Sequence, residues 1–163
     1  YLAPAQLDAI TKRIASAGVA VTVLPSTDLY LMGRGEEHNP TRGVVRAHEL
    51  LHHGVNCSLS TNNVLNPFTP FGDCSLVRMA NLYANVAHAG ARDFASCLDM
   101  VTKRPARLLR REDYGIEVGK SADLVVLDCG SSEQAVSELA VPLYGFKRGR
   151  MSFARKPVEL FRP

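Results

Sequence analysis

The segment His48–His52 carries residue types that could bind zinc. It reads His-Glu-Leu-Leu-His, and two histidines four positions apart share one face of a helix, where Glu49 could act as the general base of a zinc protease. However, the helix expected to hold the motif begins near Arg42 and ends at Gly54, which leaves the histidines at its exposed C-terminal end. No third ligand follows at a suitable spacing, because the next histidine is His88. We therefore expect a solvated helix in which His48 and His52 can each become alanine for no more than about 0.5 kcal/mol, with a zinc protease as the alternative.

Two neighbouring amides, Asn62 and Asn63, are the other candidates for chemistry. An amide donates and accepts hydrogen bonds, but it cannot act as a base and offers a metal only a weak carbonyl oxygen. In the proline-rich stretch of residues 60–72, such a pair is also ordinary turn chemistry. The preceding polar stretch, residues 26–41, adds Arg34 and His38, which could contact an anion or a substrate but in loops are commonly solvated.

Each of these polar stretches follows an apolar run and precedes a helical pattern. The runs are Val19–Leu24, which is β-branched and typical of a strand buried on both faces, and Val55–Leu59. Helices are expected at residues 4–17, 42–53, 73–86 (capped by Asp73), 91–103 and 105–109. The alternation predicts an α/β fold with a parallel sheet, in which both polar stretches leave the carboxyl ends of strands, where sites gather.

The pattern changes after about residue 110. Residues 114–128 indicate a turn followed by a strand, and residues 141–146 and 151–153 indicate a hairpin with Gly149 in its turn. A β appendage of roughly fifty residues is too small to be stable alone and must pack on another unit. We therefore divide the chain into residues 1–110 and residues 111–163.

Composition excludes several classes of protein. Of the 163 residues, 46% are hydrophobic and 21% charged, and the net charge is +3, which is ordinary for a soluble globular protein. Acidic and basic residues are interleaved without a basic stripe, which argues against nucleic acid as a partner, and no apolar run is long enough to span a membrane. The four cysteines form no CxxC pair and predict free thiols in a reducing compartment, the cytoplasm.

Several motifs resemble those of metal-dependent amidohydrolases. Gly115-Ile-x-x-Gly-Lys-x-Ala-Asp-Leu-Val-Val-Leu127 is similar to the segment by which these enzymes leave their barrel for a small β-sandwich, and Thr102-x-x-Pro-Ala-Arg-x-Leu109 to the helix before it. Further upstream the similarity narrows to cytosine deaminase and its close relatives, and in all it runs from about Leu7 to Val158. That narrower similarity is carried by Leu31-Met-Gly-Arg34, Arg42-Gly43, Gly54-Val-Asn56, Asn62-Asn-Val-x-Asn-Pro67 and Pro70-x-Gly72.

The resemblance implies a (β/α)8 TIM-type barrel with a β-sandwich. A complete barrel takes about 250 residues, so this chain would hold its C-terminal portion, residues 1–110, followed by a β-sandwich segment. The intact protein would hydrolyse a C–N bond of a small nitrogen heterocycle with the help of a divalent metal, zinc or iron. We expect it to be cytoplasmic and homo-oligomeric, with neither nucleic acid nor a membrane as a partner.

The resemblance also assigns site residues. The family binds its metal through an HxH pair and two further histidines, which this sequence does not supply, and through an aspartate after the last strand, which here is Asn62. That position is both metal ligand and catalytic proton acceptor, whereas Asn63 and Phe68 match positions that bind the substrate ring. Because an amide is not a base, the chain alone should bind no catalytic metal and be inactive, and a non-catalytic homologue is the second interpretation. In an intact protein with the four histidines, Asn62→Asp should raise hydrolysis at least about tenfold; if it lowers hydrolysis, Asp73 is the next candidate base.

Overall fold

The two apolar runs of the N-terminal half pair as parallel strands. The computed structural model, which describes residues 2–156, 158–159 and 161, places β1 (Val21–Val23) beside β2 (Cys57–Leu59), with Thr22 opposite Ser58. The Oγ1 of Thr22 lies 2.8 Å from the Oγ of Ser58. Strand β2 is buried throughout, but Thr22 is exposed. The expectation that the first strand is buried on both faces is therefore wrong for β1, because the face that carries Thr22 is open to solvent.

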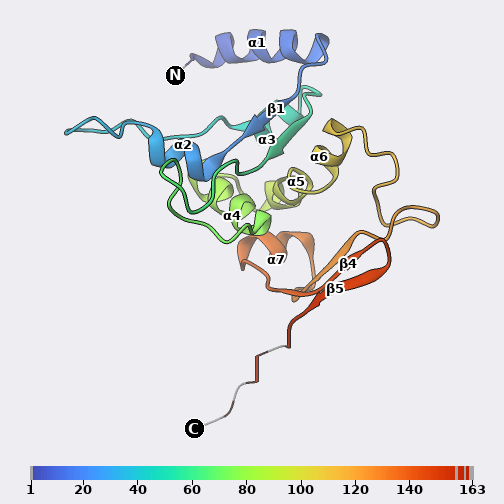
Figure 1. Cartoon of the computed structure of the whole chain (residues 1–163). Coiled ribbons are helices and arrows are strands. Elements are labelled where there is room, and N and C mark those ends of the chain that lie inside the picture. The colour runs from blue at the N-terminus through green and yellow to red at the C-terminus, as the bar shows by residue number, and fades with distance from the viewer. Residues whose placement is uncertain (1, 157, 160, 162–163) are drawn as a thin grey trace.

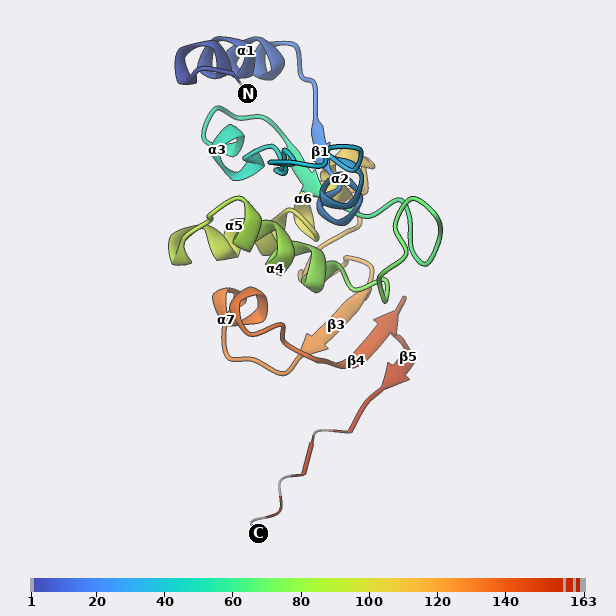
Figure 2. The same cartoon turned by 90° about the vertical axis from the view of Figure 1, so that its left-hand side faces the viewer.

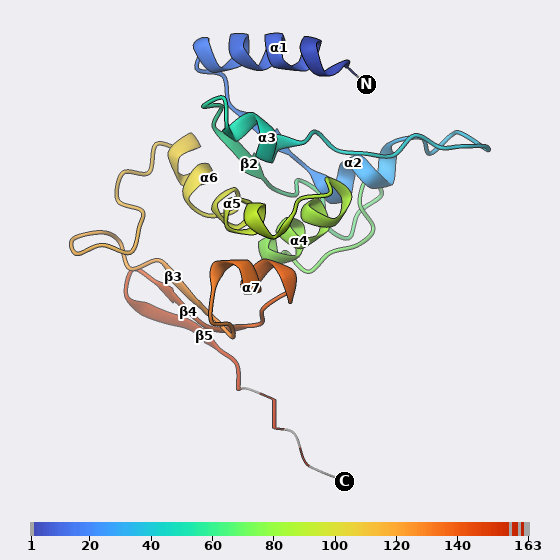
Figure 3. The same ribbon diagram turned by 180° about the vertical axis from the view of Figure 1, so that it is seen from behind.

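Helices cover this pair and separate it from a second sheet (Figure 1). They are α1 (Pro4–Ser16), α2 (Pro25–Leu31), α3 (Ala47–Leu51), α4 (Leu76–Val86), α5 (Phe94–Asp99), α6 (Lys103–Leu108) and α7 (Ser132–Ser137), with a 3-10 turn at Ala91–Asp93. Helix α1 lies at one end of the molecule and the second sheet at the other, with α4 and α5 between them (Figure 3). Over the residues that the structure describes, none of these helices has both the length and the apolar character needed to cross a bilayer.

Several helix boundaries differ from those expected. The stretch of residues 26–41 is not all loop, because α2 begins directly after β1. The helix expected at residues 42–53 is only α3, five residues long. The N-cap of α4 is Ser75, whose side chain accepts from the Arg78 N–H, and not Asp73. Helix α7 was not expected at all; Ser131 caps it by accepting from the Gln134 N–H.

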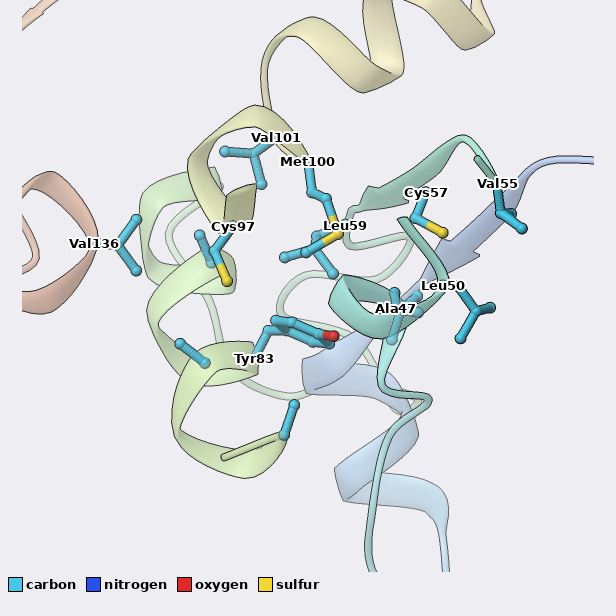
Figure 4. Close-up of a cluster of buried hydrophobic side chains, with 14 residues drawn as sticks. Ala47, Leu50, Val55, Cys57, Leu59, Tyr83, Cys97, Met100, Val101 and Val136 are labelled. Carbon is cyan, nitrogen blue, oxygen red and sulfur yellow. The ribbon is translucent and has the colours of Figure 1, made fainter. Parts of the chain in front are cut away.

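One apolar core joins the elements on both sides of α4 (Figure 4). Tyr83 on α4 and Leu59 on β2 are its largest fully buried side chains, and Cys97 and Met100 from the α5 region are buried with them. Val136 of α7 belongs to the same cluster. The segment after residue 110 is thus anchored to the N-terminal part by a buried helix, which supplies the support that a small β unit needs.

The second sheet is antiparallel, in the order β3 (Leu124–Leu127), β4 (Pro142–Lys147), β5 (Arg150–Ala154). The expected hairpin is confirmed as β4–β5, with Gly149 at a φ of 75° in its turn. Asp123 fixes that turn, since its carboxylate accepts from the Arg148 N–H (2.8 Å) and pairs with Lys147. Among the described residues the strands form this sheet and the β1–β2 pair, so the chain is α/β without a closed barrel.

Thiol labelling should distinguish the buried cysteines from an exposed one. Burial raises the pKa of Cys57 to about 11 and that of Cys97 to about 12, whereas Cys74 is exposed. Because the thiolate is the reacting species, DTNB at pH 8 should modify Cys74 at least about a hundredfold faster than either buried thiol, and urea should abolish the difference. Fast labelling of Cys57 or Cys97 without denaturant, located by mass spectrometry, would contradict this core.

Candidate functional site

Two segments leave the carboxyl ends of β1 and β2 and lie against each other. Helix α2 begins with Pro25 in its first turn, where the missing N–H has no helical partner to lose. After β2, the Ser60 N–H donates to the Val23 carbonyl oxygen (3.0 Å), so the 60–72 segment starts alongside the end of β1. In Figure 2 this segment loops out on the side of the molecule where α2 lies.

A chain of three asparagines organises the 60–72 segment. Asn66 Oδ1 accepts from the backbone N–H groups of Phe68 (3.0 Å) and Thr69 (3.1 Å). Asn66 Nδ2 donates to Asn63 Oδ1 (2.8 Å), and Asn63 Nδ2 donates to Asn62 Oδ1 (2.7 Å). The two amides that the sequence singles out are therefore hydrogen-bonded to each other and anchored on the backbone through Asn66.

Two buried threonines tie this chain of amides to α2. Thr27 on α2 donates from Oγ1 to Asn62 Oδ1 (3.1 Å) and lies 2.8 Å from the Oγ1 of Thr69. Thr69 is fully buried, and its single hydroxyl proton can be given either to Thr27 or to the Phe68 carbonyl oxygen, which lies 2.8 Å from its Oγ1. The sequence alone did not point to either threonine, and it gave Asn66 only as a member of the motif at residues 62–67. The available signal was Pro25 directly after a strand, which favours a helix start and so places Thr27 near the strand end.

Aromatic side chains lie on the same two segments as these amides and threonines. Phe68 is 59% exposed, so its ring is accessible to a ligand. The rings of Tyr30 and Phe71 pack edge to face at 5.7 Å, and the Arg34 guanidinium lies 4.7 Å from the centre of the Tyr30 ring. Arg34 is thus held in a cation–π contact. His38 is exposed in the segment between α2 and α3.

A divalent metal would need ligands beyond those that the described residues supply. These residues contain no cluster of three His, Cys, Asp or Glu side chains able to hold one. Asn62 Oδ1 already accepts two hydrogen bonds, which matches its two lone pairs. It could bind a metal only by releasing Thr27 or Asn63. The described part of the chain therefore does not fit a metal centre by itself.

The histidines of His48–His52 are not both solvated, which corrects the expectation from the sequence. His48 is buried, and its Nδ1 lies 2.7 Å from the Tyr83 hydroxyl, which also accepts from the His48 backbone N–H (3.0 Å). Desolvation by burial lowers the pKa of His48. His52 is exposed, as expected. The tyrosine is 35 positions away in the sequence, so the periodicity of α3 gives no sign of this contact, which engages His48 Nδ1. Among the described residues, no group of three His, Cys, Asp or Glu side chains would complete a metal site with His48 and His52.

Asp73, the alternative base, is held as an ion pair. Its carboxylate accepts from Arg78 Nη2 (2.8 Å) and Nε (3.1 Å) and from the Ser75 N–H (3.0 Å). The hydrogen bonds from Arg78 are the main cause of a lowered pKa at Asp73. A carboxylate stabilised in its charged form is a weaker proton acceptor, so this geometry does not favour Asp73 as the base.

The curated proteins similar to this chain include a deaminase and an amidohydrolase. Among curated proteins, the chain is 34% identical over 115 residues to a pterin deaminase of Rhizobium rhizogenes (strain K84 / ATCC BAA-868) and 36% identical over 114 residues to an N-isopropylammelide isopropyl amidohydrolase of Pseudomonas sp. (strain ADP). Each match covers 69% of this chain but only 26% and 28%, respectively, of the relative. The chain therefore spans about a quarter of the length of these relatives.

The fold has a similar counterpart among solved structures. A 5-methylcytosine deaminase from Klebsiella pneumoniae, liganded with phosphonocytosine, superposes with a TM-score of 0.88 at 27% identity, covering 99% of this chain and 40% of that one. The sequence profile of the amidohydrolase family matches residues 1–150. The chain belongs to the amidohydrolase family and is similar to its cytosine-deaminase-like members.

Proposed function

We propose that this chain is the C-terminal part of a full-length hydrolase that cleaves an exocyclic C–N bond of a small nitrogen heterocycle. Water supplies the oxygen of the new C–O bond, the C–N bond breaks, and the amine leaves with a proton from that water. The observation that carries the proposal is the hydrogen-bonded pair Asn62–Asn63, placed where β1 and β2 end. Relatives named for pterin, an ammelide and 5-methylcytosine support it, because all three act on amino-substituted nitrogen rings.

In this proposal β1 and β2 are the last strands of a TIM-type barrel, and residues 111–163 belong to a β-sandwich segment. Within the part of the chain that the structure describes, each strand of the pair has a neighbour on one side only, so the sheet has edges on which further strands can add. The full-length protein would be a cytoplasmic homo-oligomer, and the free, partly buried cysteines support a reducing compartment.

We propose that Phe68 and Asn63 contact the heterocycle. Phe68 packs on the heterocycle with its exposed ring, and Asn63 faces it with the second Nδ2 hydrogen that the bond to Asn62 leaves. A divalent metal, zinc or iron, would be held by residues outside this chain. The proton acceptor would also come from elsewhere, since the amide of Asn62 is not a base and Asp73 is paired with Arg78.

A non-catalytic member of the same fold is the second candidate. The observation that favours it is Asn62 itself, because an amide with a saturated oxygen stands where the family resemblance expects a metal-binding carboxylate. Such a protein would bind a heterocycle without turning it over.

Ammonia release separates the two candidates. The full-length protein, with its metal content measured, should release ammonia from at least one of cytosine, 5-methylcytosine, pterin and an aminotriazine. The isolated 163-residue chain, supplied with zinc or iron, should release none above the protein-free control. Binding of a heterocycle by the full-length protein without turnover of any would favour the non-catalytic candidate, and turnover by the isolated chain would contradict the assignment of the metal to other residues.

A further inference from the structure

The oxygen and nitrogen of each amide in the 60–72 segment are fixed by the backbone. Two backbone N–H groups, those of Phe68 and Thr69, donate to one side-chain atom of Asn66. A backbone N–H can only donate, so that atom must be Oδ1, and the atom facing Asn63 must be Nδ2. The alternative orientation of the Asn66 amide, with its oxygen and nitrogen exchanged, is thereby excluded.

The orientation of Asn66 fixes which atom donates and which accepts in the other two amides. Asn66 Nδ2 donates, so the atom of Asn63 that meets it at 2.8 Å is Oδ1. Asn63 then presents Nδ2 to Asn62, at 2.7 Å, and the atom of Asn62 that receives it is Oδ1. Thr27 donates to the same oxygen at 3.1 Å. Asn62 Oδ1 is thus saturated on the protein side.

The opposite end of the Asn62 amide has no such partner. Within the described residues no group accepts a hydrogen bond from Asn62 Nδ2, and the residue is exposed at the carboxyl ends of the two strands. We infer that Asn62 is a substrate-recognition residue, presenting an N–H donor to an oxo oxygen or an unprotonated ring nitrogen of the heterocycle. The identity of the ligand rests on the proposed function, but the orientation of the amide does not.

This role requires an amide and excludes a carboxylate. In Asn62→Asp the retained oxygen still accepts from Thr27 and Asn63, so the loop keeps its hydrogen bonds. The second carboxylate oxygen then replaces Nδ2 and faces an acceptor of the ligand, and two acceptors cannot bond. A role of position 62 as metal ligand and base requires the reverse, since Asn62→Asp would then create the missing carboxylate.

A second variant, Asn66→Asp, should exchange the donor and acceptor positions of the Asn63 and Asn62 amides without changing either residue. Asn66→Asp keeps an oxygen for the N–H groups of Phe68 and Thr69 but places an oxygen opposite Asn63. Asn63 must then turn its Nδ2 toward residue 66 and its Oδ1 toward Asn62. To donate to that oxygen, Asn62 must turn its own Nδ2 toward Asn63, so that Asn62 Oδ1 faces the ligand. Asn85→Asp is the matched control for charge, because Asn85 is exposed on α4 and, among the described residues, its side chain bonds only to Asn81.

The test is the affinity of the full-length protein for cytosine and for pterin, measured by isothermal titration, with folding checked by circular dichroism. Asn62→Asp should weaken binding at least about tenfold, since a hydrogen bond is lost and an acceptor left unpaired, and kcat/KM should fall rather than rise. Asn66→Asp should weaken binding similarly, and Asn85→Asp should leave it unchanged. If Asn66→Asp does not fold, Asn62→Asp decides alone.

The failures are distinguishable. Binding unchanged or tighter in Asn62→Asp, or hydrolysis raised tenfold with metal content retained, overturns the donor role while leaving the proposed function intact. If Asn62→Asp weakens binding but a folded Asn66→Asp does not, Asn66 does not set the orientation of the Asn62 amide through Asn63, and that part of the inference is overturned. Absence of binding of every heterocycle by the wild-type protein overturns the proposed function together with the ligand assigned to Asn62.

Discussion

Replacing Tyr83 by alanine is expected to lower the free energy of unfolding by about 3–5 kcal/mol, the cost of removing a large buried aromatic side chain. Tyr83 is fully buried where α4 meets α3, β2 and α5 (Figure 4). Its hydroxyl contacts His48. The upper end of this loss reaches the lower end of the stability of a typical domain, about 5–15 kcal/mol. Urea unfolding followed by circular dichroism at pH 8 measures it, and a variant that is unfolded without urea also meets the expectation.

Two phenylalanine variants separate the hydroxyl from the ring. Tyr83→Phe keeps the ring but leaves the His48 backbone N–H without its acceptor, and should cost about 1–3 kcal/mol. Tyr144→Phe removes a hydroxyl from an exposed position on β4 and should stay within about 0.5 kcal/mol of wild type. Equal effects of the two substitutions would contradict the hydrogen bond between Tyr83 and His48.

The sequence predicts the strands better than the helices between them. A β-branched run bounded by Gly18 and Pro25 contains β1, and the apolar run after Gly54 contains β2, because a strand is specified by short-range composition and by the residues that stop it. The β4–β5 hairpin was likewise accessible, since Gly149 meets the left-handed backbone of its turn.

Short helices depend on contacts that periodicity does not show. Helix α7 has six residues, too few to be stable alone, and it forms because Val136 is buried against α4 and α5. Helix α3 has five, and it is held by Tyr83 from another part of the chain. These lengths lie below the range in which a hydrophobic stripe can be recognised, so sequence reasoning extended one helix and missed the other.

The sequence predicted only part of the candidate site, because the rest depends on contacts between residues that are far apart in the chain. Asn62 and Asn63 stand out in the sequence as neighbouring amides in a proline-rich loop. Thr27, which orients Asn62, is 35 positions away and reaches it only because β1 and β2 pair in parallel. Which atom of each amide faces outward depends on Asn66 and on two backbone N–H groups, and such a relay is defined only by three-dimensional structure.

Replacing His48 by alanine is expected to cost about 2–3 kcal/mol at pH 8, since it removes a buried side chain and leaves the Tyr83 O–H unpaired. Tyr83 accepts from the His48 backbone N–H, and among the described residues His48 Nδ1 is the acceptor within reach of the Tyr83 hydroxyl proton. That contact requires Nδ1 to be unprotonated. His52→Ala, four positions along at an exposed site, is the matched control and should cost no more than about 0.5 kcal/mol.

The same contact makes the stability of the wild type depend on pH. Burial is the main cause that lowers the pKa of His48 below its ordinary 6.5; Asp93 and Glu49 oppose this, and Arg46 and His52 add to it. Below pH 6.5 the unfolded chain therefore binds a proton that the folded chain does not, so the free energy of unfolding falls as the pH decreases, until the lowered pKa of the folded state is reached. Above pH 6.5 the contribution is complete.

The measurement is the difference in unfolding free energy between wild type and each variant at several values between pH 5 and pH 8. Subtraction removes the titration of groups that both proteins share, such as the carboxylates of Asp8 and Asp73, whose pKa values are lowered by Lys12 and Arg78. The gap between wild type and His48→Ala should narrow as the pH falls below 6.5, because only the wild type loses stability through residue 48. The gap to His52→Ala should stay small throughout. A gap to His48→Ala that is constant with pH would show that the buried imidazole keeps its ordinary pKa, and would remove the physical basis for the contact between Nδ1 and Tyr83.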